Sequence, residues 1–326
     1  MKFINKNRYA VVLLLLITLN ISGCQKQQTL KNSFSVYDVQ FLSTENPAVS
    51  HELLTLDLCV PTAENIANEQ LDNPYIGGAG FFDVTSKTVP YGKNLFTKMY
   101  PASTTKILTA LLVLENCKLD EVVTVSETAT KLPGGAVSCG LQAGDQITVQ
   151  QLLYGMLLVS GNDCAVALAE HVSGSVEEFS KLMNKKCLDL TATHSNFVNP
   201  NGLHEENHYS TVYDMYLIFN ACIKNEEFLK IIHTPSFLSS YTDRNGNAVE
   251  HQYETTNMFL TSEEKSPKEV TIIGGKTGTT FDAGKCLILL SQNKAGNNQI
   301  SIVLKAESKE LLFQYIRKMI EEFSNL

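Results

Sequence analysis

The chain has 326 residues, of which 44% are hydrophobic and 18% are charged. A chain of this length and hydrophobicity is able to bury one large core or two modest ones. Its formal net charge of −8 argues against nucleic acid or anionic lipid as a partner, because both are themselves negatively charged.

The N-terminus predicts a segment that is removed after export. Basic residues precede an apolar run, Tyr9–Ile21, that is too short to span a bilayer comfortably. Ile21–Cys24 then resembles a bacterial lipobox, with cleavage before Cys24 and a diacylglyceryl group on its thiol. The alternative is an ordinary small-residue cleavage site followed by an incidental cysteine. We expect residues 1–23 to be a lipoprotein signal peptide and the protein to be exported and lipid-anchored to the outer face of the cytoplasmic membrane.

The next part of the chain predicts a tether followed by a domain. Residues 24–75 are mostly polar and lack clean periodicity, so we expect a tether and N-terminal wrap ahead of a domain at 76–326. Gly78–Val84 predicts a strand. Ile107–Glu115 predicts a buried helix, because this long apolar run contains neither Gly nor Pro.

The middle of the chain, about 115–235, predicts an all-helical lobe, and the end predicts strands. Helices are expected at Val149–Leu158, Cys164–Val172, Val176–Leu190, Val212–Ile223 and Glu226–Ile232. Strands are expected at Val270–Gly278, Cys286–Ser291 and Ile300–Leu304, before an amphipathic helix at Ser308–Phe323. Strands near both chain ends predict an α+β fold, in which one antiparallel sheet packs against the helical lobe.

The eight cysteines predict neither a disulfide framework nor a metal site. If Cys24 carries lipid, an odd number remains, at irregular spacings and without a C-x-x-C pair. Most of these lie in apolar patterns, where cysteine packs as a small hydrophobic residue. Cys164 closely follows Ser160–Asn162, and we expect it to serve packing. The isolated histidines, including His208, lack metal-ligand spacing and are expected to be surface or hydrogen-bonded structural residues.

A possible nucleophile lies at the entry to the first buried helix. Ser103 and Lys106 are three residues apart, so on a helix their side chains share a face. A serine hydroxyl is a weak nucleophile until a base takes its proton, and a desolvated lysine with a lowered pKa is such a base. Taken alone, the pair is better explained by a helix cap followed by a solvated lysine.

Two further stretches favour the nucleophilic interpretation. Ser160–Asn162 forms a short turn between two predicted buried helices, and Lys276–Gly278 ends a predicted strand. The order S-x-x-K, S-x-N, K-T-G is the signature set of penicillin-binding proteins and serine β-lactamases.

With its flanking residues, the sequence resembles the serine-type D-alanyl-D-alanine carboxypeptidases, the low-molecular-weight penicillin-binding proteins of peptidase family S11, over roughly residues 76–306. The stretches that carry the resemblance are Pro101–Lys106, Val159–Asp163, Asn199–Leu203 and Lys276–Thr279. Gly161 stands where class A β-lactamases carry Asp, which favours the carboxypeptidase branch. The resemblance implies a β-lactamase/penicillin-binding-protein transpeptidase-like fold with its cleft between sheet and helical lobe.

The resemblance also implies catalytic roles and no cofactor. Ser103 would attack the D-Ala-D-Ala bond of a peptidoglycan stem peptide while Lys106 accepts its proton. Ser160 would relay a proton to the departing D-Ala, and Asn162 would hold Lys106 and the substrate. Water would then hydrolyse the acyl-enzyme, and β-lactams would inhibit by acylating the same serine.

The third motif is implied to bind substrate. Lys276 and Thr277 would bind a substrate carboxylate, and Gly278 would let the substrate backbone approach closely. The oxyanion hole would be formed by the backbone N–H groups of Ser103 and Thr279.

The sequence departs from the family in two respects. Many members carry an Arg just past the final core strand, whereas here Ile302–Glu307 contains none; Lys305 is a candidate substitute, although a lysine is a poorer carboxylate clamp than a bidentate arginine. The family's usual β-rich C-terminal domain and membrane helix have no counterpart, so lipid at Cys24 is expected to provide the anchor.

Three alternatives remain open. A serine β-lactamase would need a base for rapid deacylation, and no E-x-x-L-N stretch occurs between Asn162 and Lys276. A non-catalytic peptidoglycan-binding lipoprotein would have no use for the whole motif set. Endopeptidase action on cross-linked D-Ala peptides would use the same chemistry.

Overall fold

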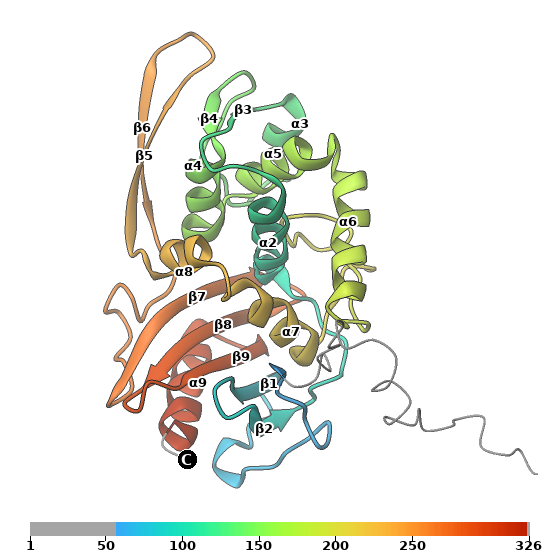
Figure 1. Cartoon of the computed structure of the whole chain (residues 1–326), viewed down its shortest axis with the longest axis vertical. Coiled ribbons are helices and arrows are strands. Elements are labelled where there is room, and N and C mark those ends of the chain that lie inside the picture. Colours follow the sequence, from blue (N-terminus) through green and yellow to red (C-terminus); the bar gives the residue numbers. More distant parts are fainter. Residues whose placement is uncertain (1–56, 325–326) are drawn as a thin grey trace, which may run out of the picture. The chain divides into compact units, whose positions relative to one another are not determined.

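Both ends of the described chain contribute to one antiparallel sheet (Figure 1). The computed structural model describes residues 57–324. In spatial order the strands are β2 (Thr88–Lys93), β1 (Ile76–Asp83), β9 (Asn298–Ala306), β8 (Gly284–Asn293) and β7 (Val270–Thr280). The prediction of an α+β fold with a sheet built from both termini is confirmed.

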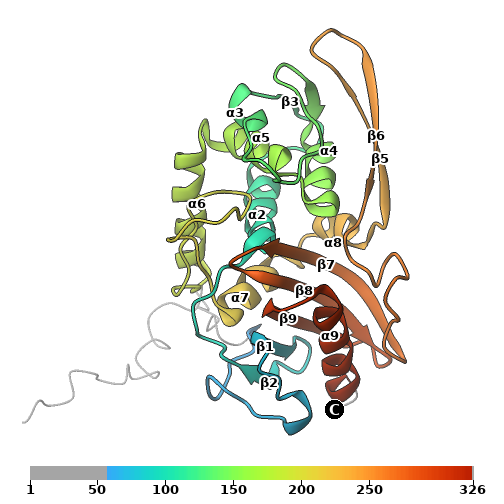
Figure 2. The same ribbon diagram turned by 180° about the vertical axis from the view of Figure 1, so that it is seen from behind.

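The sheet is apolar on both faces because both faces are covered. Leu287, Leu289 and Val303 point into a core shared with the closing helix α9 (Lys309–Phe323). Their neighbours Ile288 and Ile302 belong to the other core, which extends into the helical lobe. Alternate residues of a strand point to opposite faces, so β8 and β9 read as nearly continuous hydrophobic runs. Figure 2 shows α9 crossing the sheet on the side away from the lobe.

The lobe is built around two buried helices. Helix α2 (Lys106–Asn116) and helix α5 (Asn162–Ser173) are buried along most of their length. The surrounding helices are α3 (Glu127–Thr130), α4 (Val149–Tyr154), which continues as a π-helical turn Gly155–Val159, α6 (Val176–Asp189), α7 (Val212–Cys222) and α8 (Glu226–His233). The predicted helices are therefore confirmed, with ends shifted by a few residues.

A second sheet within the lobe was not predicted. Its order is β3 (Val122–Thr124), β4 (Gln146–Thr148), β5 (Ser236–Thr242) and β6 (Ala248–Glu254). The expectation of an all-helical lobe is thus wrong in this part. β3 and β4 are only three residues long, and the β5–β6 hairpin, which projects at the edge of the lobe (Figure 1), has few buried side chains. Neither the two short strands nor the exposed hairpin produces a strong hydrophobic pattern in the sequence.

The described residues ahead of β1 pack against the domain. The backbone N–H of Cys59 donates to Tyr216 Oη at 2.8 Å, and Tyr315 Oη donates to the carbonyl of Leu71 at 2.8 Å. The predicted signal peptide, the lipobox with Cys24 and most of the predicted tether lie outside the described residues. Within residues 57–324, none of the helices has the length and apolar character needed to cross a membrane.

Candidate active site

Ser103 lies on a short 3₁₀ helix, Ala102–Thr105, that leads directly into α2. The sequence predicted Ser103 in the first turn of the helix itself; the structure instead begins α2 at Lys106. Thr104 and Thr105 are buried, whereas Ser103 is only half-buried. The 3₁₀ turn therefore presents the serine hydroxyl at the surface of a cleft while its neighbours fix the backbone.

The Lys106 amine contacts residues of both the first and the second motif. Its Nζ lies 3.0 Å from Ser103 Oγ, donates to Asn162 Oδ1 at 2.9 Å, and donates to the backbone carbonyl of Asn201 at 2.6 Å. All three partners are uncharged, and Lys106 is fully buried. Burial, followed by the positive charge of Lys276, lowers the pKa of Lys106 well below its usual value. The site therefore favours the neutral amine.

Ser160 and Lys276 bring the second and third motifs together. Lys276 Nζ donates to Ser160 Oγ at 3.0 Å and to the Thr277 carbonyl at 2.8 Å. Ser160 has a left-handed backbone with φ of 73°, which is costly for a residue with a Cβ and is maintained only by its surroundings. Burial lowers the pKa of Lys276 to about 7.

Strand β7 runs along the cleft beside Ser103. Thr277 Oγ1 lies 2.5 Å from Thr256 Oγ1. A Cβ built on Gly278 would lie 3.0 Å from the backbone nitrogens of both Ser103 and Thr104. Only a residue without a side chain allows β7 to lie this close to the serine backbone. Thr279 follows as an exposed residue of the same strand.

These side chains line a pocket of about 340 Å³. It is lined by Ser103, Val137, Val159, Ser160, Thr255, Thr256, Glu263, Thr277, Gly278, Thr279, Lys285, Cys286, Lys309, Leu312 and Phe313. Lys106, Asn162 and Lys276 lie behind this wall and are buried. Every site residue predicted from the three motifs therefore lines the pocket or lies directly behind it.

The sequence did not assign a role to several residues of the site. Asn201 contributes only its backbone carbonyl, which no side-chain pattern reports. Thr256 lies in a connection after β6. Lys285 and Lys309 line the pocket from β8 and the start of α9, and nothing in their spacing relates them to the motifs.

Lys305, the expected substitute for the missing Arg, lines a different pocket. That pocket has a volume of about 260 Å³ and contains Lys98, Tyr100, Glu206 and Asp282. Lys305 therefore does not contribute to the wall around Ser103, whereas Lys285 and Lys309 do.

Within residues 57–324, two side-chain clusters each bring three possible metal ligands together. One consists of Cys117, Glu121 and His171, in which the histidine and the glutamate already pair at 2.9 Å. The other consists of Cys139, Asp163 and Cys164 and lies behind the Ser160–Asn162 turn. Neither cluster includes a residue that lines the pocket.

Comparison with known proteins points to one family. A family model described as D-alanyl-D-alanine carboxypeptidase matches residues 77–308. DacF of Bacillus subtilis, a D-alanyl-D-alanine carboxypeptidase, is 35% identical over 240 residues, which cover 72% of this chain and 58% of the relative. DacC of Escherichia coli, of the same description, is 31% identical over 277 residues, which cover 81% of this chain and 65% of the relative. The chain thus spans about three fifths of the length of these relatives.

A solved structure agrees as well. The Streptomyces K15 DD-transpeptidase matches with a TM-score of 0.69 at 28% identity, covering 78% of this chain and 97% of the other. Fold, motif geometry and family model all lead to one assignment. The chain belongs to the D-alanyl-D-alanine carboxypeptidase family, peptidase S11.

Proposed function

We propose that this protein is a serine D-alanyl-D-alanine carboxypeptidase that removes the terminal D-Ala of peptidoglycan stem peptides through an acyl-enzyme. The observation that carries the proposal is the 3.0 Å approach of a fully buried Lys106 Nζ to Ser103 Oγ. A neutral amine at that distance is able to take the hydroxyl proton as the oxygen attacks a carbonyl.

The contacts of Lys106 support its role as the base. A neutral amine has two N–H donors and one lone pair. Asn162 Oδ1 and the Asn201 carbonyl accept the two hydrogens, which leaves the lone pair directed to Ser103. General-base catalysis of this kind contributes roughly 10²- to 10⁴-fold in rate.

The leaving group then needs a proton. Ser160 Oγ lies between Lys276 and the pocket, so it is placed to pass a proton to the departing D-Ala amine. The tetrahedral oxyanion would accept hydrogen bonds from the backbone N–H groups of Ser103 and Thr279. Removing one such donor typically raises the barrier by about 3 kcal/mol.

The charged groups of the pocket suggest how the substrate carboxylate is held. Lys276 and Thr277 supply a cation and a hydroxyl near the serine. Lys285 and Lys309 add two further cations to the pocket wall, and Glu263, which lies 4.0 Å from Lys309, is the carboxylate that lines it. We assign carboxylate binding to these lysines in place of the arginine that many family members use.

The same chemistry would make the protein a target of β-lactams, because acyl transfer to Ser103 from a strained lactam forms a slowly hydrolysed adduct. We further propose that the protein is exported and held at the outer face of the cytoplasmic membrane by lipid on Cys24. This rests on the lipobox-like Ile21–Cys24 and the preceding apolar run.

The reaction is tested by release of D-Ala from a synthetic peptide that ends in D-Ala-D-Ala. We expect release by the wild-type chain and none by Ser103→Ala. A labelled penicillin distinguishes the rival β-lactamase function: an adduct that persists far beyond seconds supports the carboxypeptidase, whereas hydrolysis within seconds supports the lactamase.

A further inference from the structure

Two buried thiols lie directly behind the Ser160–Asn162 turn. Cys139 belongs to the loop between α3 and β4, and Cys164 belongs to the first turn of α5. Both are free, with exposed fractions of 7% and 0%. Their sulfur atoms lie within 4.8 Å of each other. The proposed reaction uses neither of them.

Two glycines provide the space that the sulfur atoms occupy. A Cβ built on Gly161 would lie 2.5 Å from Cys139 Sγ and 3.2 Å from Cys164 Sγ. A Cβ built on Gly155 would lie 2.8 Å from Cys164 Sγ and 3.0 Å from Cys139 Sγ. Both sulfur atoms therefore lie against the same two backbone positions.

The loop that carries Cys139 is tied to the active site two residues earlier. The carbonyl of Val137 accepts hydrogen bonds from both the backbone nitrogen and Nδ2 of Asn162, each at 2.9 Å. Val137 also lines the pocket, and Asn162 Oδ1 is a hydrogen-bond acceptor of Lys106. A displacement of Cys139 would therefore change the support of the residue that positions the catalytic base.

Asp163 lies beside the two thiols, which raises the question of a metal site. Its carboxylate already accepts hydrogen bonds from Ser138 Oγ at 2.5 Å, Cys139 N at 3.0 Å and Leu141 N at 3.2 Å. A metal would have to compete with these donors for the oxygen lone pairs. Chemistry between the two thiols needs no such rearrangement.

We propose that Cys139 and Cys164 form a reversible disulfide that acts as a redox-sensitive lock on the Ser160–Asn162 turn. The oxidant is a small-molecule or protein disulfide. The thiolate of Cys139, the less buried of the two, attacks one sulfur of that disulfide and releases the other as a thiol. The thiolate of Cys164 then attacks Cys139 Sγ and displaces the second thiol. Two protein thiols are oxidised, and the oxidant's S–S bond is reduced to two thiols that receive the two protons.

The disulfide acts by shortening the distance between the two sulfur atoms. An S–S bond is about 2.05 Å long, so closure draws the Cys139 loop and the start of α5 together. Val137 then moves relative to Asn162, and Lys106 loses its fixed position. Burial raises the pKa of Cys164 well above its usual value, so exchange is slow near neutral pH and faster in alkaline solution.

The experiment treats the reduced full-length chain with oxidised glutathione at about pH 9, where more thiolate is present. Remaining thiols are alkylated, and the cross-link is mapped by mass spectrometry of a non-reducing digest. We expect a peptide that joins Cys139 to Cys164. We also expect acylation by labelled penicillin to slow about a hundredfold, since a displacement of about 1 Å near a reacting group is this costly, and to recover with dithiothreitol.

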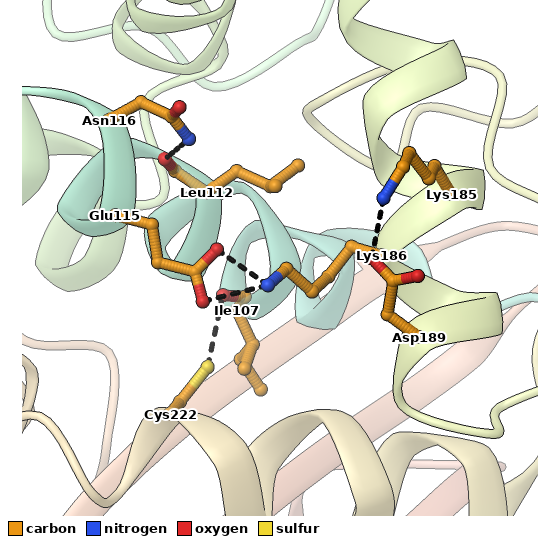
Figure 3. Close-up of polar contacts among 8 residues, drawn as sticks. All are labelled: Ile107, Leu112, Glu115, Asn116, Lys185, Lys186, Asp189 and Cys222. Carbon is orange, nitrogen blue, oxygen red and sulfur yellow. Dashed lines mark hydrogen bonds and ion pairs between the residues drawn. The ribbon is translucent and has the colours of Figure 1, made fainter.

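Controls separate this proposal from its alternatives. Cys139→Ser should make acylation insensitive to the oxidant. Cys222→Ala should not, because Cys222 is equally buried but lies on α7, where its thiol donates to the Ile107 carbonyl at 3.4 Å (Figure 3).

The outcomes are distinct. Alkylation of both Cys139 and Cys164 without a joined peptide would overturn the proposal, as would a joined peptide with an unchanged acylation rate. The acylation readout rests on the proposed function, but the mapped cross-link does not, and it requires no variant to fold. Failure of the fully reduced enzyme to react with penicillin would count against the proposed function instead.

Discussion

Lys276 Nζ donates to Ser160 Oγ at 3.0 Å, and this contact joins the edge strand β7 of the sheet to the helical lobe. It connects two residues that are 116 positions apart in the chain. It also gives Ser160 an ionisable neighbour, and we expect the protonation state of Lys276 to affect both the proposed proton relay and substrate binding.

The first prediction concerns the pH dependence of Lys276. Burial lowers its pKa to about 7, so the cation that would attract a substrate carboxylate is lost as the pH rises through 7. The pH profile of kcat/KM for a D-Ala-D-Ala peptide should therefore fall on its alkaline side with an apparent pKa near 7. Lys276→Arg keeps the charge at all accessible pH values and should abolish this fall. Lys294→Arg, on an exposed ion pair with Glu269, is the matched control. An unchanged alkaline limb in Lys276→Arg would contradict the assignment.

The second prediction concerns Asn162. Asn162→Asp places a carboxylate at the position that now lies 2.9 Å from Lys106 Nζ, which stabilises the ammonium form and raises the pKa of Lys106. A higher pKa leaves less of the neutral base at a given pH below it. The acidic limb of the acylation profile should therefore move to higher pH.

Rates of penicillin acylation across a pH series measure this shift. Asn116→Asp is the control, because Asn116 lies at the other end of α2 and its Nδ2 donates to the Leu112 carbonyl (Figure 3). If Asn162→Asp slowed acylation equally at every pH, a role in setting the state of Lys106 would be ruled out.

The third prediction concerns the carboxylate site. Lys285→Gln and Lys309→Gln should each lower kcat/KM for a peptide with a free C-terminal carboxylate by about fivefold, or about 1 kcal/mol, the upper range for partly exposed ion pairs. Neither variant should affect a peptide whose C-terminus is amidated, because the amide carries no charge to bind.

The control is Lys305→Gln, which removes the same charge from the separate pocket. Equal losses on acid and amide peptides would mean that these lysines act on folding or on general electrostatics. If Lys305→Gln lowered kcat/KM only for the peptide with a free carboxylate, carboxylate binding would belong to Lys305 instead.

The fourth prediction concerns stability. His208 is buried, its Nδ1 accepts from Val198 N, and its Nε2 lies 2.8 Å from Thr105 Oγ1. Burial lowers the pKa of His208 to about 4. Since the unfolded chain binds this proton near pH 6.5, the folded state loses stability as the pH falls from 6.5 towards 4. The full loss is about 3 kcal/mol.

Denaturant unfolding between pH 7 and 4 checks this prediction. His208→Gln should show a shallower fall in the free energy of unfolding than the wild type. His251→Gln, on the partly exposed strand β6, should retain the wild-type slope. Identical slopes for wild type and His208→Gln would contradict the role of this histidine.

Much of this architecture follows from patterns in the sequence. The run after Lys106 is mostly apolar and contains neither Gly nor Pro, which predicted the buried helix. Leu287 and Ile288 belong to different cores, so both faces of β8 are buried. The strand is therefore a nearly continuous apolar run, and this run predicted it. The three motifs were predicted to form one site because together they are the signature set of one family. The structure places residues of all three around one pocket.

The features that the sequence did not predict depend on tertiary contacts, which no local sequence pattern indicates. The carbonyl of Asn201 that holds Lys106 is backbone, so its side chain does not indicate the role. The β5–β6 hairpin is mostly exposed, so its hydrophobic pattern is weak. Lys285 and Lys309 reach the pocket only because β8 and α9 fold beside β7, which is a tertiary relationship. The Cys139–Cys164 pair likewise joins a loop to a helix, and each residue alone reads as packing.

The central claim is that Ser103 is made reactive by a neutral Lys106, and intact-mass spectrometry after exposure to penicillin tests it most directly. We predict one covalent adduct, mapped to Ser103, that forms in the wild-type chain and in Lys305→Gln but not in Ser103→Ala. In Lys106→Ala it should form at least about 10²-fold more slowly, as expected for loss of a general base. An adduct on another residue, or wild-type speed in Lys106→Ala, would contradict the account.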